Sequence, residues 1–533
     1  MALRLVELLH QPMMQPSAIA GSLNPSPHTQ YARRITLGMM GALLLICYPL
    51  FFHHLGQRDL WSSHEGRAAQ NAARLLSDGD WLLPRLFDGR IEMQKPPLYY
   101  WMTAILGWCS HGIDATVVRL PSALAACGCL LLVFWAFARK RRPWAGFVAA
   151  LILATMVRFT WMARVGRIDM PLTFAVTLSL MGYWNGRDLA QLGKAKQAFA
   201  WRLFAFLGMA MGFLLKGPIG IVLPTMVIAA LGFASVLLTK CTTFSCYLAS
   251  VRPTWWGLPL VMALVLPWFY YAHQQTHGAF FHEFFVRHNL QRGLGGDDQL
   301  DSHEHPFWFY ALHWPVDACP WSFVGIGLVI WALRTKNSLR DPLAILGCVW
   351  FLSLFLMLSC VRYKRPEYLL PAYPGLALFL GGWLEQMRPE LSERAYKRWR
   401  WCIGMVVGLS MGGWLLFVDV WLPAYEPEKE LKTFAGHVRA LAPRPGMVLL
   451  FRVDSHALNY HLGRPTERLW EWENLDIWAV QPDPVYVIMP QSWAAVWEQY
   501  LEAGHLYPVT STVELSGSKH EVPLYLFRTQ PLR

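Results

Sequence analysis

The chain has 533 residues, of which 54% are hydrophobic and 15% are charged, and its formal net charge is +12. This composition excludes an ordinary soluble protein, and no basic and aromatic module of the kind that binds nucleic acid is visible. The 10 cysteines form no CxxC pair and most, such as Cys47 and Cys127, fall in apolar blocks, so no disulfide framework is expected.

The first segment, 1–34, is polar and contains prolines, and it ends in Arg33–Arg34. Basic residues before the first apolar block favour the cytoplasmic side, so we expect a cytoplasmic tail. The apolar block that follows, 35–52, has no clear small-residue cleavage site. It is predicted to be an uncleaved signal anchor.

Apolar blocks near membrane-spanning length recur across 35–422, among them 120–138 and 144–156. By hydropathy we expect about 11 to 13 spans, which makes this region an all-α polytopic membrane bundle. Short basic connections such as "ARKRRP" (138–143) indicate the cytoplasmic side. The alternate connections, including the two long loops 54–116 and 273–306, are then external. An odd number of spans also places 423–533 outside.

The C-terminal region, 423–533, has a different pattern. The runs 447–453, 484–489 and 522–528 are typical of buried strands, and 428–442 and 492–504 have helical spacing. We therefore expect a small α/β domain outside the membrane. It contains no phosphate-cradling glycine loop, which favours a scaffold or lid.

Ionisable residues gather at the external ends of the apolar blocks. Anchoring in the headgroup layer explains Arg, Lys and Trp there, but it does not explain Glu65 or Asp169, since a carboxylate near the membrane is costly unless paired or functional. A cavity with carboxylates and cations suits a phosphate-bearing lipid substrate. The cations would hold the phosphate, and a carboxylate would remove the acceptor's proton.

The segment "SHEGRAAQNAARLLSDGDWLLPRLFDGRIEMQKPPLYYW" (63–101) resembles the first outer loop of the polyprenyl-phosphate-sugar glycosyltransferases of the GT-C class. This group includes the lipid A aminoarabinose transferase and the protein mannosyltransferases. The resemblance continues in order through "RIDMPLTFAVTLSLMGYW" (167–184), "LLKGPIGIVLP" (214–224), "HNLQR" (288–292), "HPFWFY" (305–310) and "YKRPEYLLPAYPGLAL" (363–378).

The resemblance implies a multi-pass enzyme of the bacterial cytoplasmic membrane, in contact with membrane lipids. It would move a sugar from a polyprenyl monophosphate carrier to a lipid, glycan or protein acceptor on the outer face. A secondary transporter or flippase, or a non-catalytic binder of lipid-linked sugar, is the alternative. Clustering of the charges at span ends and the lack of repeated halves disfavour a transporter.

Carried over by position, the family's Asp-Glu pair falls on His64–Glu65, so the usual candidate base is histidine here. Three interpretations remain: Glu65 acts alone, His64 acts with it, or Asp169 takes the role. We favour Glu65, with Asp169 as orienting partner or second acid. The small residues Ala68 and Ala69 would leave room for a substrate beside Glu65.

For the phosphate, Lys95 matches the family's phosphate-contacting lysine, Arg292 its arginine and Tyr368 a nearby tyrosine. Arg67 and Lys364 are further candidates. No cofactor is expected, and the family glutamate that can help hold a metal is Gln94 here. Three histidines near these motifs nevertheless leave a divalent cation open: His288, His303 and His305.

Overall fold

A computed structural model describes residues 27–239, 256–291, 304–335, 339–388, 392–444, 446–517 and 520–530. It divides into two compact units. The bundle unit comprises Met1–His53, Met93–Leu98 and Ser122–Trp414, and the sheet unit comprises His54–Glu92, Tyr99–Pro121 and Leu415–Arg533. The sheet unit therefore includes most of the loop 54–116, which we had assigned to the membrane domain.

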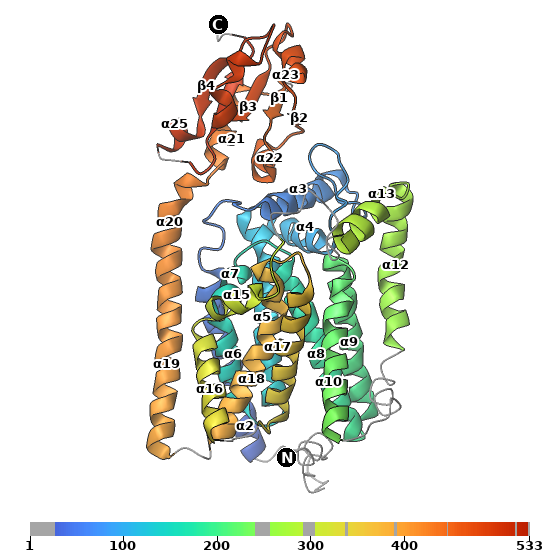
Figure 1. Cartoon of the computed structure of the whole chain (residues 1–533), viewed down its shortest axis with the longest axis vertical. Coiled ribbons are helices and arrows are strands. Elements are labelled where there is room, and N and C mark those ends of the chain that lie inside the picture. Colours follow the sequence, from blue (N-terminus) through green and yellow to red (C-terminus); the bar gives the residue numbers. More distant parts are fainter. Residues whose placement is uncertain are drawn as a thin grey trace. The chain divides into compact units, whose positions relative to one another are not determined.

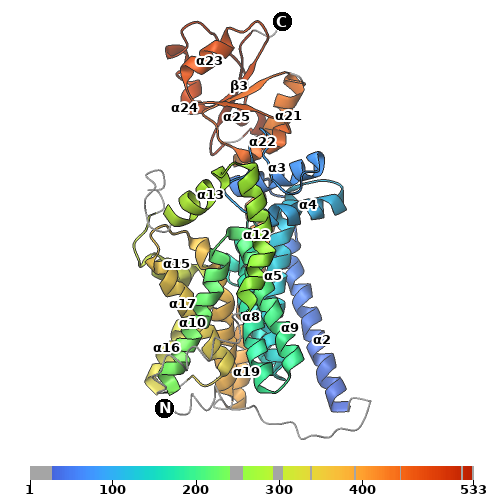
Figure 2. The same cartoon turned by 90° about the vertical axis from the view of Figure 1, so that its right-hand side faces the viewer.

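The bundle unit is helical (Figures 1 and 2). Its main elements are α2 (Pro27–Cys47), η1 (Tyr48–Phe52), α5 (Ala115–Ala138), α6 (Pro143–Ala154), α7 (Val157–Ala163), α8 (Asp169–Gln191), α9 (Ala195–Lys216), α10 (Ile219–Thr239), α12 (Gly257–Gln275), α13 (Ala279–Phe281), η3 (His282–Gln291), α15 (Phe309–Asp317), α16 (Trp321–Thr335), α17 (Pro342–Cys360), η5 (Pro366–Ala372), α18 (Tyr373–Met387) and α19 (Glu393–Leu416). The first residues of α5 and the last of α19 belong to the sheet unit.

Within the described residues, five helices are long and apolar enough to cross a membrane, or up to seven if each of two bent pairs is one span. The bent pairs are α6 with α7, at 75°, and α15 with α16, at 110°. The polytopic helical bundle is thus confirmed. Counted by length and composition, the described helices give fewer spans than the 11 to 13 expected. The other helices of the bundle are too short or too polar to be counted in this way.

The pair α8 and α9 packs closely because glycines face it from both helices. A Cβ on Gly182 would lie 2.6 Å from the backbone N of Ala205, and one on Gly208 would lie 2.5 Å from Ser179 Oγ. Small residues at helix contacts are the usual means of close approach in a membrane bundle. The close packing brings the first residue of α8 to the last residue of α9.

The sheet unit contains a five-stranded sheet of order β2-β1-β3-β5-β4. Strand β1 pairs in parallel with β2 and β3, whereas β5 pairs antiparallel with β3 and β4. The elements are α3 (Ser63–Asp78), α4 (Leu98–Ser110), η7 (Phe417–Trp421), α20 (Leu422–Tyr425), η8 (Glu426–Glu428), α21 (Lys432–Leu441), β1 (Val448–Phe451), α22 (His456–Leu462), β2 (Glu467–Leu469), α23 (Trp472–Ala479), β3 (Tyr486–Pro490), α24 (Gln491–Ala494), η9 (Trp497–Gln499), β4 (Tyr507–Ser511), α25 (Thr512–Ser516) and β5 (Leu524–Arg528).

Both faces of this sheet are covered. Alternation along β1 turns Val448 and Leu450 toward α21 and α22, and Leu449 and Phe451 toward α23. The expected α/β domain is confirmed, including the three strands predicted from the sequence. Strands β2 and β4 were missed because β2 has three residues and β4 is largely exposed, so neither leaves a clear apolar run.

Helix α3 of the first loop packs on α22 of the C-terminal region within the sheet unit (Figure 1). Ser62 caps the start of α3 by accepting from the backbone N–H of Glu65, and Gly79 ends it with φ 72°. A Cβ on Gly66 would lie 2.4 Å from the backbone N of Ala457. Gln70 donates to the carbonyl of His456 at 2.7 Å. Gly66 thus makes room for α22, and Ala68 and Ala69, which were expected to leave room for a substrate, are buried.

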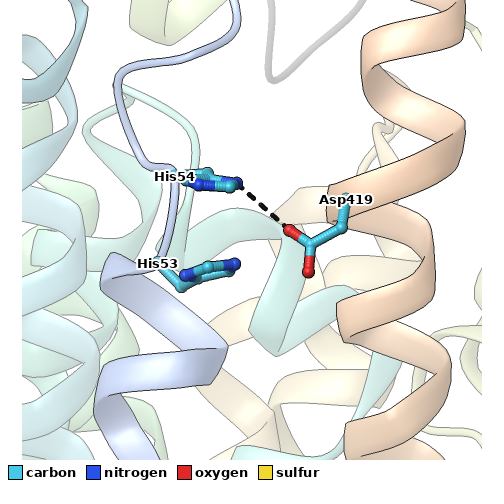
Figure 3. Close-up of side chains that lie close together, drawn as sticks. All are labelled: His53, His54 and Asp419. Atoms are coloured by element: carbon cyan, nitrogen blue, oxygen red, sulfur yellow. Dashed lines mark hydrogen bonds and ion pairs between the residues drawn. The ribbon is translucent and has the colours of Figure 1, made fainter.

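An ion pair joins two distant segments of the same unit. His54 Nδ1 lies 3.1 Å from Asp419 Oδ1 in η7 (Figure 3). Both side chains are about half exposed, so the pair adds little to stability. It shows that the chain before α3 lies beside the helix that leads into the C-terminal strands.

Candidate active site

A cavity of about 210 Å³ lies inside the bundle unit, where polar residues of several helix ends meet. Segment 93–98 and the ends of α8, α9, η3 and η5 all contribute to its wall. The lining residues are Lys95, Asp169, Leu172, Lys216, Ile219, Leu223, Phe284, His288, Asn289, Tyr310, Leu358, Val361, Tyr363, Glu367, Tyr368 and Pro371. Apolar walls with a few convergent charged groups are typical of a ligand site.

Asp169 is the first residue of α8 and is almost fully buried. Its Oδ1 lies 2.6 Å from Lys216 Nζ, at the end of α9, and its Oδ2 lies 3.2 Å from Arg167 Nε. A carboxylate in the first turn of a helix is also favoured by the helix dipole. The structure therefore holds the Asp169 carboxylate at the cavity wall, between two cations.

The same network continues to the segment before α18. Arg167 Nη2 lies 2.7 Å from Glu367 Oε1 in η5, so this guanidinium bridges two carboxylates. The next residue, Tyr368, has its ring 4.1 Å from Lys216 Nζ, measured to the ring centroid, which is a cation–π contact. Glu367 and Tyr368 are thereby brought to Asp169, almost 200 residues earlier in the chain.

Among the described residues, the formal charges of the cavity wall and of Arg167 beside it do not cancel. Lys95 and Lys216 line the cavity and Arg167 pairs with its two carboxylates, which gives three positive charges against two negative charges from Asp169 and Glu367. The cluster therefore carries one excess positive charge in apolar surroundings, where it attracts an anion more strongly than in water. Lysine side chains commonly bind phosphate monoesters and diesters, so a phosphate group suits this cavity.

Known proteins resemble this chain over most of its length. Residues 39–281 match the family model of dolichyl-phosphate-mannose-protein mannosyltransferases. The undecaprenyl phosphate-alpha-4-amino-4-deoxy-L-arabinose arabinosyl transferase of Pseudomonas aeruginosa is 30% identical over 392 residues, which cover 73% of this chain and 67% of that protein. The chain belongs to this family of polyprenyl-phosphate-sugar glycosyltransferases.

Solved structures show the same GT-C fold as this transferase. The crystal structure of ArnT from Cupriavidus metallidurans bound to undecaprenyl phosphate has a TM-score of 0.71 at 18% identity, covering 92% of this chain and 98% of that one. The archaeal oligosaccharyltransferase AglB from Archaeoglobus fulgidus has a TM-score of 0.53 at 11% identity, with 88% and 71% covered. Together with the family membership, the apolar helices make the protein a multi-pass membrane glycosyltransferase.

In the present chain, Glu65 lies in the sheet unit and has no exposed surface. Its Oε1 lies 2.6 Å from Arg119 Nε and 3.3 Å from Arg58 Nη2, and its Oε2 accepts from Arg119 Nη2 at 3.2 Å. Arg119 is equally buried and also donates to three backbone carbonyls, those of Leu55, Arg58 and Asp59. Glu65 thus closes a buried ionic cluster and does not line the cavity.

The remaining predicted residues divide between the two units. His64, half-buried in the first turn of α3, and Arg67 belong to the sheet unit, where Arg67 Nη2 lies 3.3 Å from His456 Nε2 and its Nε 3.6 Å from Glu92 Oε2. Lys95 and Tyr368 line the cavity.

Lys364 is buried and donates to the carbonyl of His305 at 2.6 Å, so it fastens a loop and does not line the cavity. Arg292 and His303 lie outside the described residues.

Lys216 and Glu367, like Arg167, belong to the site but were not assigned a role from the sequence. Lys216 lies in "LKGP" and Glu367 in "RPEY", both among the motifs that carry the family resemblance. A charged residue at the end of an apolar block was the available signal for each. Only the packing of α8 on α9 and of η5 on α8 shows that they meet Asp169.

Proposed function

We propose that the cavity binds the sugar–phosphate end of a polyprenyl monophosphate donor and that the sugar passes to an acceptor hydroxyl or amine on the outer face of the bacterial cytoplasmic membrane. The observation that carries the proposal is Asp169 between Lys216 and Arg167 in a cavity that Lys95 also lines. The group supplies a base and an excess of positive charge within one apolar cavity.

In the proposed reaction the acceptor attacks the anomeric carbon of the donor sugar. The bond from that carbon to the phosphate oxygen breaks, and a bond to the acceptor oxygen or nitrogen forms. Asp169 takes the acceptor's proton, and polyprenyl phosphate leaves with its charge held by Lys95, Lys216 and Arg292. These side-chain cations would supply the charge stabilisation that a metal ion could otherwise supply. We therefore propose that the reaction requires no bound metal ion.

The choice of base follows from access. Glu65 was favoured on sequence position, but it is fully buried against two arginines, whereas Asp169 lines the cavity. Neighbouring cations make any carboxylate a weaker base. Here they also draw the donor phosphate to the same place, and proximity offsets much of that loss. His64 has no counterpart role in this scheme.

Purified enzyme with undecaprenyl phosphate-linked aminoarabinose, the donor in the name of the relatives, tests the proposal. Release of undecaprenyl phosphate that depends on Asp169 and an acceptor supports sugar transfer. Donor binding without turnover would instead indicate a non-catalytic binder, and movement of intact donor across a vesicle bilayer would indicate a flippase. Arg292→Ala should lose most turnover, and a wild-type rate would exclude that residue from the phosphate site.

We also propose a cytoplasmic N-terminus and a periplasmic C-terminal domain, supported by the Lys/Arg asymmetry of the connections. Reporter fusions after Arg142 and after Arg533 should report opposite sides of the membrane. Two fusions on one side would contradict the orientation and the assignment of the acceptor to the outer face.

A further inference from the structure

A second cavity, of about 210 Å³, lies within the sheet unit. Its wall is formed by the chain before α3 and by the helical run of η7, α20 and η8. Its polar lining residues are His54, Gln57, Arg58 and Glu426, and Val418 and Leu422 are among the apolar ones. The proposed reaction uses none of these residues, so this cavity has no role in it.

The helical run at one wall continues a helix that can cross a membrane. Segments η7 and α20 follow α19 directly, and Glu393–Leu441 is one of the five helices that are long and apolar enough to be a span. Only 11% of its apolar window is buried within the protein. Leu416, Val420 and Trp421 are each more than half exposed. Exposed apolar side chains gathered on one helix are suited to contact lipid.

Aromatic rings mark the level of the cavity along this helix. The rings of Phe417 and Trp421 are stacked with their centroids 5.0 Å apart, and those of Trp421 and Tyr425 are stacked at 5.1 Å. Lys429 Nζ lies 5.4 Å from the ring centroid of Tyr425. Tryptophan, tyrosine and lysine in this arrangement are typical of the boundary between hydrocarbon and water. The pattern indicates that the cavity lies in the headgroup layer.

Glu426 gives the cavity wall a carboxylate with an unused acceptor. Its Oε1 accepts from the backbone N–H of Asp59 at 2.5 Å, which fixes the side chain at the wall. Its Oε2 is buried and has no hydrogen-bond partner among the described residues. An acceptor that is buried without a donor is destabilising. The carboxylate is therefore suited to a ligand that brings N–H donors.

Among the described residues, the cavity wall carries one cation for one anion. Arg58 is the cation and Glu426 is the anion. His54 is paired with Asp419 at 3.1 Å (Figure 3), and Arg58 Nη2 lies 3.3 Å from Glu65 Oε1. A ligand with only a negative charge would be repelled by Glu426, and one with only a positive charge would be repelled by Arg58. A zwitterion complements both side chains.

We propose that this cavity binds the headgroup of a phospholipid that carries a primary ammonium. The ammonium would pair with the Glu426 carboxylate, the phosphate would lie beside Arg58, and the acyl chains would run along the exposed apolar side chains of η7. The bound lipid would hold residues 54–58 and 418–427 together at the membrane surface. This inference is independent of the base and the phosphate contacts proposed for the candidate active site.

Native mass spectrometry of the delipidated full-length enzyme in detergent measures the affinity of the first bound lipid. The probe is dioleoyl phosphatidylethanolamine, and the matched probe is dioleoyl phosphatidylcholine, which has the same phosphate and chains but no N–H donor. Glu426→Gln removes the negative charge and keeps an oxygen that can accept from Asp59 N–H. Glu428→Gln is the control, because it removes the same charge two residues further along and Glu428 does not line the cavity. Gln57→Trp narrows the cavity from an exposed position.

We expect the wild type and Glu428→Gln to bind phosphatidylethanolamine about tenfold more tightly than phosphatidylcholine, as one charge-assisted hydrogen bond does. Glu426→Gln should lose this preference, and Gln57→Trp should bind phosphatidylethanolamine more weakly. Asp169→Asn should bind both lipids like the wild type, so a failure of the catalytic scheme stays distinguishable.

Equal binding of the two lipids by the wild type, or a preference that survives in Glu426→Gln, would overturn the proposal. Wild-type affinity in Gln57→Trp would place the lipid elsewhere and would also overturn it. Tighter binding of dioleoyl phosphatidylglycerol would assign the cavity to an anionic lipid instead. Equal affinity for glycerophosphoethanolamine, which has no acyl chains, would assign it to a soluble amine.

Discussion

Replacing Asp169 by asparagine tests the proposed base without changing the size of the side chain. The amide oxygen of the new side chain could still accept a hydrogen bond from Lys216 Nζ, now 2.6 Å from Oδ1, but the amide could not take a proton from the acceptor. General-base loss costs about 10²- to 10⁴-fold in rate. Because Asp169→Asn also removes one negative charge beside the donor phosphate, donor affinity should hold or improve. We therefore expect kcat to fall by at least about 100-fold at unchanged or lower donor KM.

Glu65→Gln is the contrasting change, and its cost should appear in stability. Glu65 is the carboxylate that pairs with both Arg119 and Arg58, at 2.6 Å and 3.3 Å, and it has no exposed surface. Removing one partner of a buried ion pair leaves uncompensated charge and costs about 3 to 5 kcal/mol. The variant should therefore unfold at a markedly lower temperature, while the fraction that stays folded keeps near wild-type kcat.

The assay measures release of undecaprenyl phosphate from labelled donor under saturating donor, with thermal unfolding of the same detergent-solubilised samples. Rates are expressed per folded molecule. A Glu65→Gln variant that keeps the wild-type unfolding temperature but loses turnover, together with an active Asp169→Asn variant, would refute this assignment. In that case Glu65 would be the base, and Asp169 would only orient Lys216.

Three further predictions concern the phosphate site and the sheet unit. Lys95→Ala should express normally and lose most turnover because a cation at the cavity wall is removed, and a wild-type rate would move Lys95 to a membrane-anchoring role. Gly66→Ala should lower the unfolding temperature, since its Cβ would lie 2.4 Å from the backbone N of Ala457, a strain of about 1 to 3 kcal/mol; Gly38→Ala, with open space around it, is the control. Burial, and then the charge of Arg67, lower the pKa of His456 from 6.5 to about 4. Neutral His456 should therefore stabilise the fold fully above pH 6.5, and this contribution should decline as the pH falls toward 4. A His456→Gln variant should flatten that part of the plot of stability against pH.

Local patterns in the sequence predict much of the fold and the family of this protein. Apolar blocks of spanning length predict the polytopic bundle, since hydrocarbon tolerates little else. Short apolar runs such as 447–453 predict the buried C-terminal strands, and the ordered motifs from 63 to 378 identify the family. The motifs alone predict Lys95 and Tyr368 for a phosphate site, and both residues line the cavity.

Only the tertiary structure distinguishes the surroundings of the two carboxylates. Glu65 and Asp169 both follow an apolar block among basic residues, and sequence position favoured Glu65. Arg119, 54 residues away from Glu65, closes on it and buries it, whereas Lys216 holds Asp169 at a cavity wall. Pairing and access set what a carboxylate does, and both depend on residues distant in the chain. The same holds for α3, whose Gly66 accommodates α22, a helix that begins 390 positions later.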